Sequence, residues 1–184
     1  MNAQRSTAQM VLIAVTMTLG VALFLLIITG SVKTWRNATG SMEPTLPIGS
    51  RMLVIRSSRA NRGDIVTFRY PLDERVTFVK RIVGVAGDTV EIRAKKLIVN
   101  GKSVAEPYVM HDDDTIYPNN PAMPEPYRSR DHFGPFHVPE GQLFVLGDNR
   151  DRSSDSRYFG TIGRKMVVGH PILLYSLKRG VWLP

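Results

Sequence analysis

The sequence predicts a mainly β protein, in which a single N-terminal transmembrane helix precedes an antiparallel β-sheet domain with a small, loop-rich β insertion. Three observations predict this class. Residues 11–30 form an uncharged apolar run, the rest of the chain consists of short β-rich runs separated by turns, and no long stretch after residue 30 keeps a helical periodicity. Hydrophobic residues make up 43% of the 184 residues, which is typical of a chain with a packed core.

The apolar run has the length of a membrane span. A bilayer core needs about 20 helical residues, and residues 11–30 (VLIAVTMTLGVALFLLIITG) supply that length. A cleavable signal peptide has a shorter apolar core of about 7–15 residues and a small-residue cleavage site, for which Thr29-Gly30-Ser31 is a weak candidate. We therefore predict an uncleaved signal anchor after a short tail of residues 1–10, in preference to a removed signal peptide or a buried helix of a soluble protein.

The charges that flank the anchor leave its orientation open. Arg5 lies before the run, while Lys33 and Arg36 lie after it. Positive charge usually marks the cytoplasmic side, so this balance leans slightly against a cytoplasmic N-terminus. Trp35 is typical of a residue at the membrane–water interface.

Charge and composition narrow the classes of partner. The net charge of +8 suggests an anionic partner, either nucleic acid or lipid. The apolar run favours the lipid bilayer, and without a basic recognition helix or an aromatic RNA-binding signature we expect no nucleic acid partner. The chain has no cysteine, which excludes disulfides, zinc–thiolate sites and cysteine nucleophiles. The histidines show no metal-ligand spacing, so no metal site is predicted; they are His111, His132, His137 and His170.

After the anchor, runs rich in β-branched and aromatic residues predict strands, and Gly87-Asp88 and Asn100-Gly101 predict turns between them. We expect a catalytic β domain made of residues 37–91 and 141–184, with residues 92–140 as a smaller hairpin and loop insertion. Within it, residues 111–139 are rich in Pro, Asp and Asn and predict a loop. The predicted strands cover residues 51–55, 64–70, 75–85, 89–92, 96–99, 142–146 and 165–169, with a tail strand over 172–177.

Two of these segments carry candidate chemistry. Ser41 lies eleven residues after the apolar run, in Gly40-Ser41-Met42-Glu43-Pro44, where a glycine permits close approach of a ligand. Taken alone, Ser41 is a turn serine and Lys80 a solvated strand lysine. Strand alternation, however, places Lys80 on one face with Phe78 and Ile82, and such surroundings lower the pKa of an amine from about 10.4. A neutral lysine beside a serine can hydrolyse an amide without His, Cys or metal.

A third segment is the most specific. Residues 147–160 read GDNRDRSSDSRYFG, a pattern too regular for a surface loop of Asx and Gly residues. The spacing of Asp155 and Arg157 predicts an ion pair that braces the site, and Asp148 with Arg150 predicts a second one. Gly147 is expected to keep space beside the nucleophile.

Together the three segments resemble bacterial type I signal peptidases, the membrane-bound S26-type Ser/Lys proteases (leader peptidases) that remove secretory signal peptides. The resemblance spans most of residues 40–160 and the anchor. It departs at Ala86, where the family often carries proline. It implies that Ser41 is the nucleophile and an oxyanion donor through its own N–H, that Lys80 is the general base, and that Thr39 is a second oxyanion donor. The hydroxyl that orients the lysine matches Ser153.

The resemblance also implies the supporting residues and the biology. The supporting residues are Ser153, Asp155, Arg157, Gly147, Asp148 and Arg150, and the substrate-binding residues are Met42, Thr77, Phe78 and Val79. The implied enzyme needs no cofactor and cuts preproteins after small residues in an Ala-x-Ala pattern. Its implied partners are secretory preproteins, the lipid bilayer and the nearby protein-translocation channel. The implied location is the bacterial cytoplasmic (inner) membrane, crossed once, with the catalytic domain on the extracytoplasmic side.

Two alternatives remain at the level of sequence. One is a related Ser/Lys peptidase with another substrate, such as a conjugation-pilus maturase or an organelle inner-membrane peptidase. The other is a catalytically silent, membrane-tethered β module that binds extended peptides, against which the joint presence of Ser41, Lys80 and Ser153 argues. The anchor and the lack of a DNA-binding domain argue against a soluble self-cleaving repressor.

Overall fold

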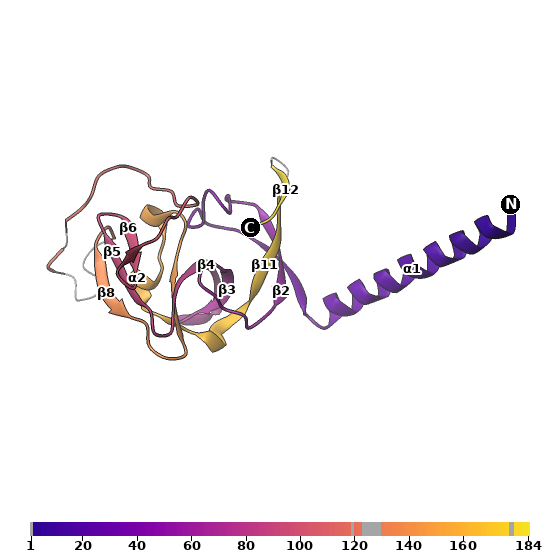
Figure 1. The fold of residues 1–184 in the computed structure, drawn as a ribbon, viewed down its shortest axis with the longest axis horizontal. Helices are drawn as coiled ribbons and strands as arrows, with labels where there is room; N and C mark the ends of the chain where they lie inside the picture. Colours follow the sequence, from indigo (N-terminus) through magenta and orange to yellow (C-terminus); the bar gives the residue numbers. More distant parts are fainter. Residues whose placement is uncertain (1, 119, 123–129, 177–178) are drawn as a thin grey trace. The chain divides into compact units, whose positions relative to one another are not determined.

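The computed structural model describes residues 2–118, 120–122, 130–176 and 179–184 (Figure 1). The chain divides into two compact units, Met1–Lys33 and Thr34–Pro184. The first contains one helix and the second contains two β-sheets, so the predicted class, mainly antiparallel β with one N-terminal apolar helix, is confirmed.

The helix α1 (Asn2–Ile28) contains residues 11–28 of the predicted anchor, which was expected to extend to residue 30. It begins well before residue 11, because the helix continues through polar residues as far as Asn2. The boundary between a tail of residues 1–10 and the anchor stays a prediction. The segment Thr7–Leu26 is long and apolar enough to cross a membrane. Its hydroxyls donate to carbonyls of the preceding turn, Thr16 to Leu12 O at 3.0 Å and Thr18 to Ala14 O at 2.8 Å. Polar groups satisfied within the helix suit a lipid environment.

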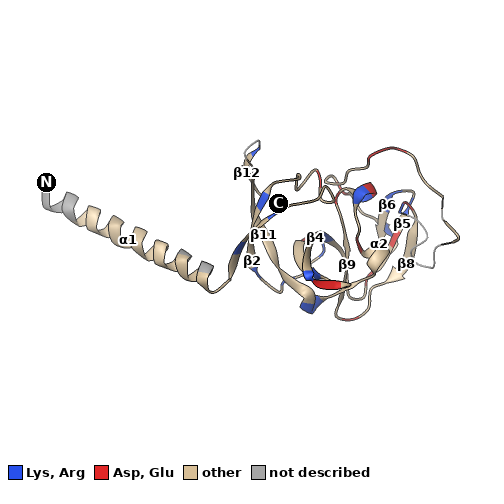
Figure 2. Cartoon of the chain, turned by 180° about the vertical axis from the view of Figure 1, so that it is seen from behind, with Lys and Arg blue, Asp and Glu red and all other residues tan. Residues whose placement is uncertain are grey.

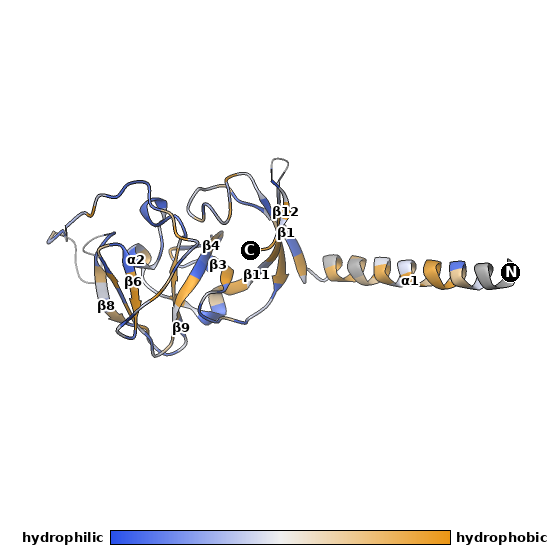
Figure 3. Cartoon of the chain, turned by 45° about the horizontal axis from the view of Figure 1, so that its top comes forward, coloured by the Kyte–Doolittle hydropathy of each residue, from blue (hydrophilic) through white to orange (hydrophobic). Residues whose placement is uncertain are grey.

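The composition of α1 differs from that of the second unit. From Thr7 onward no charged side chain occurs on the helix, whereas charges are frequent on the β unit (Figure 2). Hydrophobic residues follow one another along most of the described helix (Figure 3). The helix ends at Ile28, and the φ of 67° at Gly30 in the turn that follows allows Ser31 N to donate back to Leu26 O at 3.0 Å.

The larger sheet has the strand order β1-β2-β11-β3-β4-β9-β10, and β12 pairs with β11. Apart from the pair of β1 with β2, the neighbouring strands of this sheet that the structure describes are antiparallel. The long strand β4 carries Lys80, the predicted general base. It pairs with β3 on one edge as far as Arg81 and with β9 on the other edge from Arg81 onward. The strands are β1 (Val32–Arg36), β2 (Arg51–Arg56), β3 (Ile65–Tyr70), β4 (Asp73–Val85), β9 (Gln142–Leu146), β10 (Ile162–Gly163), β11 (Val167–Ser176) and β12 (Gly180–Trp182).

The smaller sheet has the order β7-β6-β5-β8. Asn100 and Gly101 have φ values of 53° and 75°, as expected for the tight turn predicted there between β6 and β7. Its strands are β5 (Thr89–Arg93), β6 (Lys96–Val99), β7 (Lys102–Ser103) and β8 (Phe133–His137). The remaining elements are the short helices η1 (Arg150–Arg152), α2 (Ser156–Phe159) and η2 (Arg164–Met166).

Three predictions about the strands need correction. Strand β8 lies inside residues 111–139, which were expected to be a loop; Phe133 and Phe136 pack into the core despite the intervening proline. Residues 164–166 form η2, so the strand expected from residue 165 begins at Val167. The strands β1, β10 and β12 were not predicted. The proposed division of the soluble part at residues 92 and 140 stays a prediction.

The two sheets share a core. Side chains of β4 and β9, such as Val83 and Phe144, pack with Val90, Ile92 and Phe133 of the smaller sheet. A second cluster lies within the larger sheet around Phe68 and Ile82. A third cluster fixes the loop between β1 and β2; its buried members are Met42, Leu46, Met52, Val54, Ile65 and Leu174.

Candidate active site

Ser41 lies in the loop between β1 and β2, and the fold holds this loop rigidly. The buried Asn37 side chain donates to Leu46 O at 2.7 Å and to Pro47 O at 3.2 Å, which closes the loop across its base. Met42 and Leu46 insert into the core on either side of a single turn, joined by Leu46 N to Met42 O at 2.8 Å. Ser41 is therefore positioned by the residue that follows it.

Lys80 reaches Ser41 from β4. Its Nζ donates to Ser41 Oγ at 2.7 Å, although 39 residues separate the two in the chain. The Lys80 side chain is buried, with 4% of its surface exposed, and lies 5.2 Å from the centre of the Phe78 ring. The structure thus brings the two residues predicted as a pair into direct contact.

Burial controls the protonation of Lys80. Loss of water lowers the pKa of its amine to about 8, and this effect outweighs the nearby Asp155 carboxylate, which raises it. The Arg157 guanidinium lowers the pKa further, while Asp148 raises it. A substantial fraction of the amine is therefore neutral near physiological pH, as a proton acceptor must be.

The segment 147–160 packs directly against Ser41. Asn149 N donates to Ser41 O at 3.1 Å, so the motif fixes the backbone of the serine. Gly147 lies between Ser41 and Ser153. A Cβ atom on this residue would lie 2.4 Å from Ser41 O and 2.2 Å from Ser153 Oγ. Any side chain at Gly147 would thus displace the loop of Ser41 or the Ser153 side chain.

Asp155 and Arg157 form the predicted ion pair in full burial. Arg157 Nε and Nη2 donate to the two Asp155 oxygens at 2.8 and 2.9 Å, and Asp155 also accepts from Gly147 N at 3.1 Å. Burial acts to raise the pKa of Asp155, but the charge and hydrogen bonds of Arg157 outweigh it and lower that pKa. Arg157 Nη2 further donates to Arg150 O at 2.7 Å, so one guanidinium joins both ends of the motif.

The second predicted brace, between Asp148 and Arg150, is wrong. Asp148 accepts from Arg81 Nε at 2.9 Å and Nη2 at 2.7 Å, and from Thr45 at 2.6 Å. Arg150 instead donates to Glu106 and, through Nε, to Gly147 O at 3.0 Å. Residues close in sequence point to opposite sides here, and each takes a partner from another part of the fold.

A cleft of about 360 Å³ opens beside the pair. It lies between the end of β1 with the residues that follow it and the first half of β4. Its lining is mainly apolar. It contains the predicted catalytic and oxyanion residues Ser41, Lys80 and Thr39, and the predicted substrate-binding residues 77–79. The lining residues are Trp35, Arg36, Asn37, Ala38, Thr39, Ser41, Met52, Val76, Thr77, Phe78, Val79, Lys80, Arg152 and Ser154.

A family model for signal peptidase, peptidase S26, matches residues 8–176. The chain belongs to this family. The S26 relatives include signal peptidase I of Bacillus licheniformis, 41% identical over 134 residues, which cover 70% of this chain and 68% of the relative. Signal peptidase I V of Bacillus subtilis (strain 168) is 39% identical over 133 residues, which cover 70% of this chain and 77% of the relative.

A third S26 relative and a solved structure extend the comparison. Signal peptidase I of Pseudomonas fluorescens is 34% identical over 169 residues, which cover 74% of this chain but 59% of that longer protein. A signal peptidase I structure from Enterococcus faecalis V583 is 36% identical and covers 61% of this chain and 96% of the other, with a TM-score of 0.47. Membership of the S26 family makes this chain a peptidase.

Two predicted polar residues of the S26 site lie near the pair. Thr39 Oγ1 lies 3.2 Å from Ser41 Oγ at the edge of the cleft. The Ser153 hydroxyl is buried, and no hydrogen bond joins it to Lys80 in the part of the chain that the structure describes. It lies near enough to Asp155 to lower the pKa of that carboxyl, but outside hydrogen-bond geometry. Orientation of Lys80 by Ser153 stays a prediction.

One predicted substrate-binding residue departs from the cleft. The Met42 side chain is fully buried in the core cluster of the β1–β2 loop, and it is absent from the lining of the cleft. The Met42 side chain thus anchors the loop of Ser41, and a role in substrate binding stays a prediction. The other lining residues were not predicted from the sequence as parts of the site; they are Trp35, Arg36, Asn37, Ala38, Met52, Val76, Arg152 and Ser154. For Arg152 and Ser154, their position inside the polar motif was the available signal.

Gly147→Ala is expected to lower peptidase activity by about a hundredfold, because small misplacements of reacting groups have effects of that size. The added methyl group would meet Ser41 O, a backbone atom that moves only together with the rest of Ser41. The matched control is Gly163→Ala, where the nearest side-chain atom would lie 3.9 Å away. Initial rates on one peptide would measure both variants, and equal rates for Gly147→Ala and wild type would contradict the packing argument.

Proposed function

We propose that this S26 peptidase removes N-terminal signal peptides from exported preproteins by a Ser/Lys acyl-enzyme mechanism, with cleavage after small residues. The observation that carries the proposal is the 2.7 Å contact between Ser41 Oγ and the buried Lys80 Nζ, at the floor of an open apolar cleft. Family membership supports the substrate class, and the contact supports the mechanism.

Acylation begins when neutral Lys80 Nζ accepts the proton of Ser41 as Oγ attacks the scissile carbonyl carbon. The carbonyl oxygen becomes an oxyanion, which the Ser41 N–H and the Thr39 hydroxyl stabilise. Among the described residues the Ser41 N–H has no acceptor, so it is available for this role. The carbon–nitrogen bond then breaks, and the Lys80 ammonium gives its proton to the departing amine of the mature protein.

Deacylation reuses the same two side chains. Lys80, neutral again, accepts a proton from a water molecule that attacks the ester between Ser41 and the signal peptide. The carbon–oxygen bond to Ser41 breaks, and Lys80 returns the proton to Oγ. Each proton that leaves Ser41 or water is thus carried by a single amine, so the cycle ends with free enzyme and two products.

The edge of β4 supports the binding of an extended substrate. Strand β9 pairs with β4 from Arg81 onward, so on that side the backbone before Arg81 has no partner strand among the described residues. Ile82 exchanges hydrogen bonds with Gly63 and Asp64 on the β3 side. Because backbone groups alternate along a strand, those of Thr77 and Val79 face the cleft and can pair with a peptide.

The apolar lining supports the binding of apolar side chains before the cut, and membership of the S26 signal peptidase family supports alanine at the first and third of these positions. The experiment is cleavage of preprotein variants by the full-length chain in detergent micelles, with the new N-terminus identified by mass spectrometry. Alanine at both positions should give the fastest cleavage at one site, and leucine at the first position should reduce it strongly. Equal cleavage of all variants, or cuts at many sites, would contradict the proposed selectivity.

The anchor supports a location at the bacterial cytoplasmic membrane. We place the N-terminus in the cytoplasm and the catalytic unit on the outer side, near the translocation channel from which cleavage sites emerge. Protease protection of the full chain in oriented membrane vesicles tests this arrangement: only proteases added to the extracytoplasmic side should digest the β unit.

The pH profile follows from the pKa of Lys80. Because the neutral amine is active, kcat/KM should rise about tenfold per pH unit below a pKa of about 8 and level off above it. For a catalytic group that is active in its protonated form, kcat/KM would instead fall as the pH rises through its pKa. A rate that is independent of pH between 6 and 9, with binding unchanged, would show that Lys80 is not the titrating base.

A further inference from the structure

We propose that Arg152 is a specificity-determining residue: it favours substrates with an acidic side chain next to the scissile bond and disfavours basic ones. This inference rests on the proposed peptide cleavage and adds a charge preference to it. Arg152 belongs to η1, immediately before Ser153, and its side chain lines the cleft that also contains Ser41 and Lys80.

The charge of the cleft supports this preference. Arg152 and Arg36 both line it and are exposed, with 68% of the Arg152 side chain open to solvent. No Asp or Glu is among the described lining residues. Since Lys80 acts in its neutral form in the proposed mechanism, the lining of the cleft presents two guanidinium groups to a bound peptide. The carboxylates of Asp112 and Glu43 act on Arg152 from outside that lining. A carboxylate of the substrate would meet attraction there, and an ammonium would meet repulsion.

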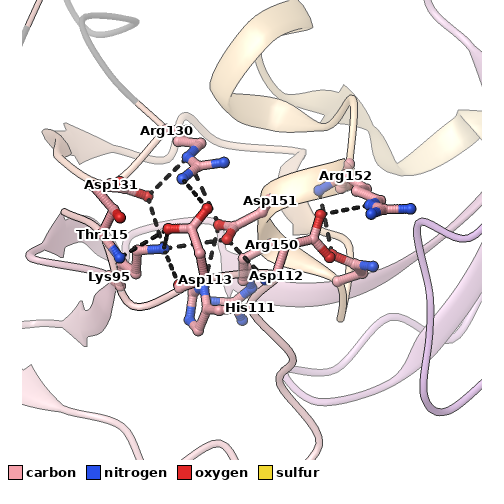
Figure 4. Close-up of polar contacts among 12 residues, drawn as sticks. Lys95, His111, Asp112, Asp113, Thr115, Arg130, Asp131, Arg150, Asp151 and Arg152 are labelled. Atoms are coloured by element: carbon pink, nitrogen blue, oxygen red, sulfur yellow. Dashed lines mark hydrogen bonds and ion pairs between the residues drawn. The ribbon is translucent and has the colours of Figure 1, made fainter. Parts of the chain in front are cut away.

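Arg152 is held in place by the insertion. Its Nε donates to Asp112 Oδ2, which occupies one of the five N–H donors of the guanidinium (Figure 4). The remaining donors are available to a ligand. The Asp112 carboxylate offsets part of the positive charge, so we expect a moderate preference and not an absolute one.

Asp112 is itself fixed to the catalytic motif. Met110 runs parallel beside Asn149, with Met110 N donating to Asp148 O at 2.9 Å and Arg150 N donating to Met110 O at 3.0 Å. Asp112 N donates to Asp151 Oδ2 at 3.0 Å. The segment that presents Asp112 is therefore joined by backbone hydrogen bonds to the residues that position Ser41.

Asp151 completes the attachment. It accepts from Lys95 Nζ at 3.1 Å and lies 3.2 Å from His111 Nδ1, in the group of charged residues that joins the insertion to η1 (Figure 4). Burial acts to raise the pKa of Asp151, but His111, Lys95 and Asp112 N outweigh it and lower that pKa to about 2. The carboxylate is thus ionised throughout the pH range in which the enzyme would work.

The test compares substrates that differ in one charge. Each residue within three positions of the cut in a cleavable peptide, except the alanines at the first and third positions before it, is set in turn to Asp, Asn or Lys. The value of kcat/KM is then measured for full-length enzyme in uncharged detergent. We expect the wild type to prefer Asp over Lys by roughly threefold to fivefold at one position at least, the scale of exposed ion pairs. The ratio should shrink at high salt.

Three variants isolate the residue. Arg152→Gln should bring the Asp-to-Lys ratio closer to one, with the remaining preference due to Arg36. Arg152→Glu should lower the ratio further, and Arg152→Lys should keep part of it. The matched control is Arg93→Gln, because Arg93 is 66% exposed and also pairs with a carboxylate, but lies on β5 of the smaller sheet. This control should keep the wild-type ratio.

The outcomes separate the two proposals. If no peptide is cleaved by the wild type, the proposed function fails before the inference is reached. If peptides are cleaved but the Asp-to-Lys ratio is the same in wild type, Arg152→Gln and Arg152→Glu, the inference is overturned and the proposed function stands. A ratio that changes equally in Arg93→Gln would mean that overall charge, not Arg152, sets the preference.

Discussion

Lys80→Met is expected to reduce peptide cleavage by about four orders of magnitude or more while the protein stays folded. Methionine has a similar length to lysine and suits the apolar surroundings, so the variant removes the proton acceptor and little else. Losses of this size are typical when one member of a nucleophile–base pair is removed. Single-turnover rates with a peptide substrate measure the effect.

Although Lys80→Met should lose activity, its stability should be unchanged or higher than that of the wild type. At neutral pH the fold disfavours the charged form of the Lys80 amine, because its folded pKa of about 8 lies below the value of about 10.4 in an unfolded chain. This cost grows as the pH falls from about 10.4 to about 8, and methionine removes it. We expect an unchanged or higher Tm for Lys80→Met. The control is Lys165→Met at an exposed position, which should keep full activity.

A variant that cleaves as fast as the wild type would show that another group is the base. A variant that is inactive because it has unfolded is recognised by its circular dichroism spectrum, and Lys80→Gln would then replace it. In either case the activity and the Tm are measured on the same preparation, so that loss of the base and loss of the fold are distinguished.

Asp155→Asn is expected to lower the free energy of unfolding by about 3–5 kcal/mol, because it leaves the buried Arg157 charge without a carboxylate. Both side chains are almost entirely buried, so water cannot take the place of the missing partner. For a chain of this size the corresponding fall in Tm is at least about 6 °C. Thermal unfolding of the full chain in detergent, followed by circular dichroism, measures it.

A second ion pair supplies the control for Asp155→Asn. Glu91→Gln breaks the bond between Glu91 and Arg93, which lies at 2.7 Å with the arginine mostly exposed. Exposed pairs of this kind contribute about 1 kcal/mol or less. If Asp155→Asn and Glu91→Gln shift the Tm equally, the buried pair does not brace the site as the structure indicates.

The regular parts of the fold could be predicted because local chemistry decides them. Alternating apolar residues and the Asn100-Gly101 turn indicated the strands and the hairpin, and an uncharged run of membrane length indicated the helix. Strand β8 was missed because Gly134 and Pro135 resemble a loop, and its two phenylalanines are buried only once the smaller sheet has formed. Strand β1 carries two charges in five residues, a weak pattern that pairing overrides.

The contacts within the site likewise depend on tertiary structure and could not be predicted from local sequence patterns alone. Alternation along β4 placed Lys80 on an apolar face, but its contact with Ser41 depends on how the β1–β2 loop folds over the sheet, and the resemblance to a known family supplied that pairing. The pairing of Asp148 with Arg81 joins residues 67 apart. No local spacing predicts such a pair, which is why the nearer Arg150 was predicted in its place.

Whether this chain cuts preproteins through Ser41 is measured most directly by cleavage of one preprotein with an Ala-x-Ala site by wild type and Ser41→Ala, under identical detergent conditions. We expect a single cut after the second alanine by the wild type and loss of cleavage by about four orders of magnitude in Ser41→Ala, with an unchanged Tm. Cleavage at the same site and rate by Ser41→Ala would contradict this expectation, as would a folded wild type that leaves the preprotein intact.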